Sequence, residues 1–240
     1  MEPALALKRY LEAVRARFGY LATWLPNSPL KLGDVGTWSE KEGFRRETSL
    51  QRLGLAVKVR RSTMSGDLDH ASLEQVKASV GLSGPASIQL GFGSAGGFVF
   101  HASGCTIEEL DEVDTLGVEI MDLFRQKIWQ PSWVLVDTVV KAQKATIIVS
   151  ESNDASLEVT GPADLTQIGK VDLAITAQSG SFMRFVGEAG LTPLFRGRRV
   201  ARKLFGLFGA QIETMRGDEA LEPAEFEALE PLDFMDTSAE

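Results

Sequence analysis

Two runs near the middle of the chain decide the fold: Trp133-Val134-Leu135-Val136-Asp137-Thr138-Val139-Val140 and Ala145-Thr146-Ile147-Ile148-Val149-Ser150. Both are rich in β-branched residues, which favours strands, and the basic segment 141–144 is predicted to turn between them. Because no strand–helix–strand alternation follows, we expect an α+β fold: a twisted, mostly antiparallel sheet with peripheral helices. Further strands are predicted at 55–60, 76–83, 87–92, 155–160, 170–177 and 181–186.

Two helices are predicted. In residues 4–23, Leu7, Leu11, Val14 and Phe18 recur at three- and four-residue steps, with basic residues mostly between them. Such a helix either lies on its own domain or meets anionic headgroups with its basic face. The second helix is predicted over 106–129, with Thr106 and Glu109 as a capping box. Residues 62–75 are expected to form a mobile connection.

The composition excludes several classes of protein. With 240 residues, 44% apolar and 24% charged, the chain has ample material for a globular core, so disorder of the whole chain is excluded. A single cysteine, Cys105, forms no internal disulfide, and together with two histidines it cannot close a structural zinc site. No apolar run reaches the roughly 18 residues of a membrane-spanning helix, and residues 1–25 lack a signal-peptide pattern. We therefore expect a cytoplasmic protein.

The charge is divided unevenly along the chain. Residues 205–240 carry ten acidic residues and one basic residue, a net charge of −9, whereas the whole chain carries −8. The first 204 residues therefore carry +1. The tail also contains apolar residues that a purely solubilising segment does not need, so we expect it to dock on the body: Leu221, Phe226, Leu229, Leu232, Phe234 and Met235.

Basic residues of the body gather in three clusters, near residues 8–17, 45–61 and 196–203. Blocks of like charge are either solvated faces or, when an acidic tail screens them, surfaces for an anionic partner.

No enzyme site is predicted. Gly91–Gly96 fits the glycine pattern of dinucleotide-binding loops, but a strand-like segment follows it where that motif needs a helix, so a hairpin or bulge is the better interpretation. His101 and Cys105 suggest a thiol–imidazole pair, with the thiolate favoured near the expected helix start. A nucleophile also needs an orienting group and an oxyanion site, so a chance pairing is the better account. We expect no catalytic residue, no metal and no cofactor.

The stretch from Trp133 to Thr146 resembles the strand–turn–strand segment of gasdermins. Several further motifs on both sides of this stretch, together with the N-terminal helix, follow the order found in bacterial gasdermins, to about residue 204. These motifs are Gly19–Leu21, Pro29–Leu32, Gly161–Ala163, Gly169–Val171, Phe185–Glu188 and Leu191–Phe195. The resemblance rests on this order; Gly33–Gly36 and the acidic tail do not align, and the acylated N-terminal cysteine of many relatives has no counterpart.

The resemblance implies an autoinhibited pore-forming effector. A protease, in bacteria typically caspase-like, removes a C-terminal segment. The freed domain binds anionic lipid, oligomerises and converts two regions into membrane-spanning β-hairpins of a barrel, which kills the infected cell. The protein would be a cytoplasmic monomer before cleavage and a homo-oligomer in the inner or plasma membrane afterwards, with no nucleic-acid partner.

The pattern of residues also favours a pore-forming function. Residues 76–100 and 144–186 are long, low in charge and partly alternating, as a membrane strand of about 9–11 residues requires. Strands of a soluble twisted sheet would have the same pattern. We therefore predict a pore-forming domain at 1–204 and an inhibitory segment at 205–240.

Specific residues are assigned to each role. Cleavage is predicted at Arg216-Gly217 by a basic-specific protease, or at Asp218 by an acid-specific one. The inhibitory contacts are assigned to Leu221, Phe226, Leu229, Leu232 and Phe234. The lipid contacts are assigned to Lys8, Arg9, Arg15, Arg17, Arg196, Arg198, Arg199, Arg202 and Lys203. The alternative function is a lipid- or protein-binding module that makes no pore and recruits a partner through its acidic tail.

Overall fold

The computed structural model describes residues 3–23, 30–39, 43–72, 75–79, 87–93, 95–160, 174–200 and 226–228. Two α-helices and one short 3₁₀ helix lie in this part of the chain: α1 (Pro3–Phe18), η1 (Leu50–Leu53) and α2 (Val113–Arg125). The strands are β1 (Leu21–Ala22), β2 (Asp34–Ser39), β3 (Gly43–Ser49), β4 (Val59–Thr63), β5 (Leu68–Ala71), β6 (Gln75–Ser79), β7 (Ser87–Phe92), β8 (Phe98–Ser103), β9 (Thr106–Leu110), β10 (Val134–Ser150), β11 (Ala155–Thr160), β12 (Ala174–Ser179), β13 (Phe182–Val200) and β14 (Phe226–Ala228).

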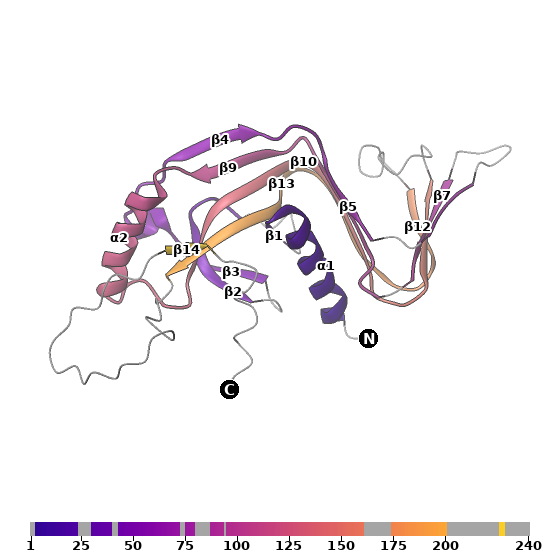
Figure 1. Cartoon of the computed structure of the whole chain (residues 1–240), viewed down its shortest axis with the longest axis horizontal. Coiled ribbons are helices and arrows are strands. Elements are labelled where there is room, and N and C mark those ends of the chain that lie inside the picture. The colour runs from indigo at the N-terminus through magenta and orange to yellow at the C-terminus, as the bar shows by residue number, and fades with distance from the viewer. Residues whose placement is uncertain are drawn as a thin grey trace, which may run out of the picture.

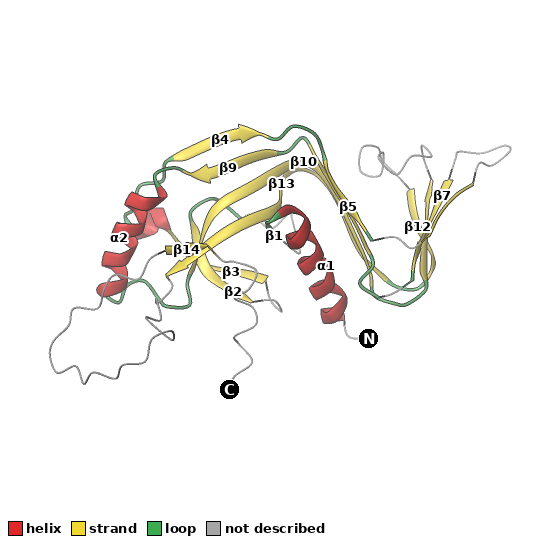
Figure 2. Cartoon of the chain, in the orientation of Figure 1, coloured by secondary structure: helices red, strands yellow, loops and turns green. Residues whose placement is uncertain are grey.

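Strands dominate the molecule, as Figure 2 shows. The described strands form a ten-stranded sheet, here the main sheet, and a four-stranded sheet of β6, β7, β11 and β12, here the distal sheet. The main sheet is arched, with α1 beneath the arch, α2 at one end and the distal sheet at the other (Figure 1). Every strand pair is antiparallel. The prediction of an α+β fold with a twisted, mostly antiparallel sheet and peripheral helices is confirmed.

The centre of the main sheet is one long strand, β10, and not two strands with a turn. The predicted turn at 141–144 is wrong, because β10 runs without interruption from Val134 to Ser150. The segment contains no Gly, Pro, Asn or Asp, and its exposed Lys141 and Gln143 alternate with the buried Ala142, as in a strand. Shifts of register against β13 occur at 136–138, 140–142 and 142–144, and bulges of this kind bend a strand without ending it.

The helices bury apolar residues against the main sheet. Helix α1 places Ala6, Tyr10 and Val14 in a cluster with residues of β8, β10 and β13. Helix α2 places Leu116 and Ile120 in a second cluster with Leu135 and Trp129. Neither helix of the described chain has the length and apolar composition that crossing a membrane requires.

Helix α1 is shorter than predicted. It ends at Phe18 and not at residue 23, because Gly19 adopts a φ of +69° and its N–H donates to the carbonyl of Arg15 at 2.7 Å. A left-handed glycine directly after the last turn is a common helix stop.

Helix α2 begins seven residues later than predicted. Thr106–Leu110 form strand β9, which lies between β4 and β10, so Thr106 and Glu109 make no capping box. Glu112 instead occupies the N-cap with a φ of +54° and no side-chain cap. Pairing with two neighbouring strands outweighed the local helix signal.

Three other predictions change. Only Val59 and Arg60 of the predicted strand at 55–60 are in β4, and the connection predicted over 62–75 contains β5, which pairs with β8. The strand predicted at 181–186 extends to Val200 as β13. The strands predicted at 87–92 and 155–160 are confirmed as β7 and β11. Residues 80–86 and 161–173 lie outside the described residues.

Candidate functional site

The distal sheet continues a four-stranded part of the main sheet. In the main sheet, β5 pairs with β8, β8 with the outer half of β10, and β10 with the outer half of β13. In the distal sheet the order is β6, β7, β11, β12. The strands β6, β7, β11 and β12 are consecutive in the chain with β5, β8, β10 and β13, respectively. Four chain paths therefore run from one sheet into the other and keep the same order in both. The two segments predicted as membrane hairpins, 76–100 and 144–186, therefore lie side by side.

The register of the distal sheet sorts its residues by polarity. Apolar residues are paired with apolar residues across all four strands, in the rows Val76, Leu90, Leu157, Ala177 and Ala78, Ile88, Val159, Ile175. Between them lies a polar row, Lys77, Gln89, Glu158, Thr176. Among the residues whose side chains are described, Leu90 and Leu157 are buried and Gln89 is exposed. The sheet thus has one apolar face and one polar face.

All four chain paths break between the two sheets along one line, here called the bend line. Its connections include 93–97, 151–154 and 180–181. Hydrogen bonds join them: the Ala95 N–H donates to Asn153 Oδ1 at 3.0 Å, and the Ser181 N–H donates to Ser152 Oγ at 2.9 Å. The glycine pattern at 91–96 belongs to this line, because Gly96 has a φ of +89° and strand β8 follows it. The predicted need for glycine dihedrals is confirmed, but the predicted hairpin is wrong, because β7 and β8 lie in different sheets and do not pair with each other.

The basic residues of α1 lie in different surroundings. Arg9 reaches the bend line, where Nη1 donates to the carbonyl of Ala95 at 2.8 Å and its side chain covers Gly96. Lys8 lies 3.8 Å from Glu12, one turn along the helix. Arg17 is exposed, whereas Arg15 is half-buried beside β13. The four residues therefore do not form one uniform headgroup surface.

The described arginines of the third cluster lie at the C-terminal end of β13. Arg196 Nε donates to the carbonyl of Gly19 at 3.1 Å, and its guanidinium lies 4.2 Å from the centre of the Tyr20 ring. Arg198 Nε donates to Asp137 Oδ2 at 2.6 Å. Arg15, Arg196 and Arg198 line one recess, so the structure brings together part of the first and third clusters.

Strand β14, from the acidic tail, pairs with this end of β13. Its register places Ala228 opposite Arg198, Glu227 opposite Arg199 and Phe226 opposite Val200. The other assigned tail and basic residues lie outside the described residues: Arg202, Lys203, Arg216, Gly217, Asp218, Leu221, Leu229, Leu232 and Phe234.

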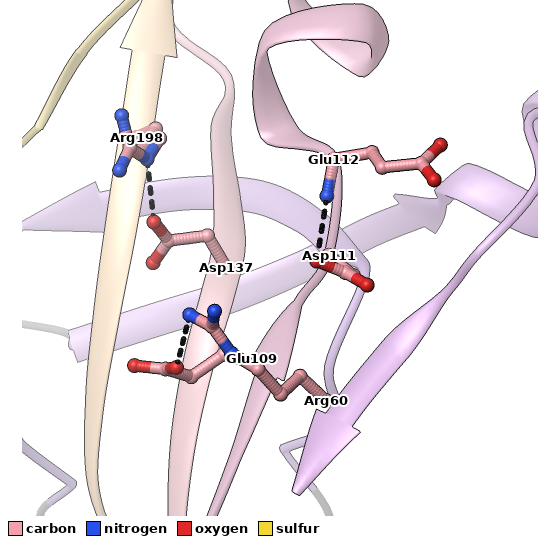
Figure 3. Close-up of polar contacts among 6 residues, drawn as sticks. All are labelled: Arg60, Glu109, Asp111, Glu112, Asp137 and Arg198. Carbon is pink, nitrogen blue, oxygen red and sulfur yellow. Dashed lines mark hydrogen bonds and ion pairs between the residues drawn. The ribbon is translucent and has the colours of Figure 1, made fainter.

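Ion pairs join β4 to β9, and sequence reasoning missed them. Arg60 lies 2.9 Å from Glu109, and Arg61 lies 2.9 Å from Glu108 (Figure 3 shows the first pair). Lys141 lies 2.7 Å from Glu108 on the other side. Burial alone would raise the pKa of Glu108, but the hydrogen bonds from Lys141 and Arg61 outweigh it and hold this pKa below its usual 4.5. Because the sequence predicts 108 and 109 in a helix, it does not predict these ion pairs with β4 and β10.

His101 and Cys105 do not form a nucleophilic pair. The His101 Nδ1 lies 2.5 Å from Asp69 Oδ1, and both His101 and Cys105 are buried. Burial raises the pKa of the Cys105 thiol to about 11, with a smaller contribution from Asp67. Cys105 also does not lie at a helix start, where a thiolate would be favoured, since α2 begins only at Val113.

No protein-family model matches the sequence, and no curated protein matches it either. Among solved structures, the chain is similar to the cryo-EM structure of the gasdermin A3 membrane pore, with 10% sequence identity and a TM-score of 0.36. The match covers 90% of this chain and 98% of that chain. At this identity and TM-score, the similarity assigns neither a family nor a function to the chain.

Proposed function

We propose that the chain is a membrane pore-forming effector that its acidic C-terminal segment holds inactive. Proteolysis near Arg216-Gly217 or Asp218 frees the pore-forming domain at 1–204, with the first residues of the tail still attached, and this fragment oligomerises on anionic lipid. The distal sheet then contributes two hairpins to a β-barrel, and the resulting pore kills the cell, as an antiphage defence would require. The activating protease is of the caspase-like or basic-specific class, and the chain itself has no enzymatic role.

The observation that carries this proposal is the two-faced distal sheet. A strand that lines a membrane pore needs alternating apolar and polar residues, and all its backbone groups must be paired in the sheet. The rows of the distal sheet meet the first condition on four strands, which come from two segments far apart in the sequence. The pairing of β7 with β11 places the two hairpins next to each other, as neighbouring hairpins of one β-barrel would be.

The inhibitory role of the tail is supported by β14 and by charge. Strand β14 covers the edge of β13 at Arg198–Val200, and an uncovered edge strand is a template for pairing with another chain. Cleavage after Arg216 removes nine acidic residues and no basic residue, so the net charge changes from −8 to +1. Each basic residue near an anionic membrane contributes about 1 kcal/mol of binding free energy.

The test is to produce residues 1–216 and the full chain in bacteria and to follow growth and dye entry. We expect residues 1–216 to arrest growth and admit dye, and the full chain to do neither. A shortened chain that is folded but harmless would contradict the proposal.

A second test addresses the tail alone. Replacing Phe226 and Leu229 by Asp in the full chain should release toxicity without a protease, if these residues hold the tail on the body. Replacing Ala220 and Ala224 by Asp is the matched control, because it adds the same charge to the same segment without removing an assigned apolar contact. Continued inhibition by the Asp variant would remove Phe226 and Leu229 from the inhibitory contact.

The alternative, a binding module that makes no pore, predicts a different result with purified protein. Removing the tail would then leave dye-filled anionic liposomes intact, whereas the pore proposal predicts leakage.

A further inference from the structure

A recess of about 410 Å³ opens between the C-terminal end of α1 and strands β4, β9, β10 and β13. This volume lies within the usual range of small-molecule sites, about 300–1,000 Å³. We call this cavity the arginine recess. Its charged lining residues are Arg15, Arg60, Arg196, Arg198, Glu109 and Asp137.

The sheet register builds the floor of the arginine recess. Arg60 is opposite Glu109, Glu109 is opposite Thr138, and Thr138 is opposite Arg196, so one row crosses four strands. The bulge between Val136 and Thr138 leaves Asp137 as an extra residue, which allows its side chain to lie beside that of Arg198. Figure 3 shows these groups in alternating order: the Arg198 guanidinium contacts the Asp137 carboxylate, and the Arg60 guanidinium lies between that carboxylate and Glu109.

The arginine recess has an excess of positive charge. Four arginines face two carboxylates, which leaves a formal charge of +2. The C-terminal end of α1 opposes this with a partial charge of roughly −0.5, and Arg196 caps that end through the carbonyl of Gly19. The balance still favours an anion with two negative charges.

The ion pairs within the arginine recess leave its arginines able to bind a ligand. A guanidinium has five N–H groups, so it can hold a carboxylate and an anion at once. Arg60 and Arg198 are each tied to one carboxylate, at 2.9 Å and 2.6 Å, which orients them without neutralising the recess. Planar arginine groups suit the oxygens of a phosphate, which they bind with two parallel hydrogen bonds.

We propose that the arginine recess is a binding site for a phosphomonoester group. A phosphomonoester has a second pKa near 6, so it carries nearly two negative charges at neutral pH, matching the excess charge of the recess. Because its ligands come from α1, β4 and β13, the bound phosphate ties the end of the helix to both strands. This site does not depend on pore formation.

The group can belong to a soluble metabolite or to a lipid headgroup, and two probes with the same phosphate separate these sources. Glycerol 3-phosphate is the soluble probe, measured by calorimetry and by the shift in melting temperature of the full chain. Phosphatidylcholine vesicles containing phosphatidic acid are the membrane probe. Vesicles containing phosphatidylglycerol, a phosphodiester with one charge, control for general attraction to anionic surfaces.

The variants are Arg60→Gln and Arg196→Gln, each expected to weaken phosphate binding about tenfold or more, since a hydrogen bond to a charged group is lost. Arg60 is the sharper choice, because it lies outside the basic clusters assigned to lipid contact. Arg196→Lys retains the charge but loses the planar fork, so an intermediate loss is expected. Arg125→Gln is the matched control: it removes an equal charge from the exposed end of α2, where Arg125 pairs with Asp122 at 2.7 Å.

Each result decides the matter. Binding of glycerol 3-phosphate that depends on Arg60 and Arg196 supports the site with a soluble ligand, and dependence seen only with phosphatidic acid vesicles supports a headgroup ligand. The proposal is overturned if neither probe binds, if both variants bind as Arg125→Gln does, or if glycerol 3-phosphate does not bind and phosphatidylglycerol vesicles bind as well as phosphatidic acid vesicles. Liposome leakage by residues 1–216, measured separately, reports on the proposed pore and not on this site.

Discussion

The main sheet and the distal sheet share four chain paths but bury their apolar residues differently. In the main sheet, α1 and α2 each contribute to a large buried cluster. The buried cluster of the distal sheet is smaller, contains no residue of either helix and includes Val99 and Ile148 from the main-sheet side of the bend line. Its described polar contacts are cross-strand ones, such as Gln178 Nε2 donating to Glu158 Oε2 at 2.6 Å. In the proposed function, the main sheet is the stable scaffold, and the distal sheet is the part that exchanges its buried contacts for lipid.

The largest expected difference concerns global stability. Leu135 lies in the α2 cluster and Leu157 in the distal cluster, and both are buried. We expect Leu135→Ala to reduce the free energy of unfolding by about 2–5 kcal/mol, and Leu157→Ala to reduce it by less, because the distal sheet can open while the scaffold stays folded. Urea denaturation measures both. Hydrogen exchange should accelerate across the chain in the first variant and only in the distal sheet in the second. Equal losses in both variants would remove the distinction between scaffold and distal sheet.

The second difference concerns the two faces of the distal sheet. In residues 1–216, Leu157→Asp puts a charge on the apolar face, and Ser156→Asp puts the same charge next to it on the polar face. An arginine or lysine on a lipid-facing strand costs about 2–4 kcal/mol at the membrane midplane, and an aspartate costs less, so Leu157→Asp should slow liposome leakage by about tenfold. Ser156→Asp should leak nearly as fast as the parent. Circular dichroism confirms that both variants are folded, and equal leakage would show that this face does not meet lipid.

The sequence predicts the fold class and the distal strands, and it fails where tertiary pairing overrides local signals. The distal strands at 87–92 and 155–160 are short, alternating and followed by turns or bends, so periodicity alone locates them. The long strands β10 and β13 cross the bend line and carry bulges, which no local pattern reveals. Thr106–Leu110 reads as the start of a helix, yet it pairs with strands on both sides.

The arginine recess could not be predicted from the sequence, because it also depends on tertiary pairing. Arg15, Arg60 and Arg196 are far apart in the chain; the cross-strand register brings Arg60 and Arg196 onto one row, and the packing of α1 adds Arg15. The bulge at Asp137 adds a side chain to a face that simple alternation would not give it. The positions of β4 and β9 also had to be known before Arg60 could be paired with Glu109.

The third prediction uses pH to test the scaffold. Glu108 is mostly buried between Arg61 and Lys141, and its pKa lies below 4.5 in the folded chain. Its ion pairs therefore stabilise the fold above pH 4.5, and this contribution is lost as the pH falls through the lowered pKa. We expect Glu108→Gln to reduce the free energy of unfolding by about 1–2 kcal/mol at pH 7. Urea denaturation from pH 7 to pH 3 should show the difference from the parent shrinking. A difference that does not change with pH would mean that packing, and not charge, accounts for the loss.

The smallest effect expected is at the bend line, where α1 meets the connection between the two sheets. Arg9 donates to the carbonyl of Ala95, so Arg9→Gln should cost about 1 kcal/mol, the usual worth of one such hydrogen bond. Lys8→Gln is the matched control, because it removes the same charge from the next residue, whose partner Glu12 lies on the same helix. The readout is hydrogen exchange: the Arg9 variant should exchange faster in β7 and β11 but not at 134–140 of β10. If the Lys8 variant accelerates exchange there equally, the charge of α1 matters and not this contact. If neither variant changes the distal sheet, α1 is part of the scaffold alone, and the two sheets are coupled only through the strands that they share.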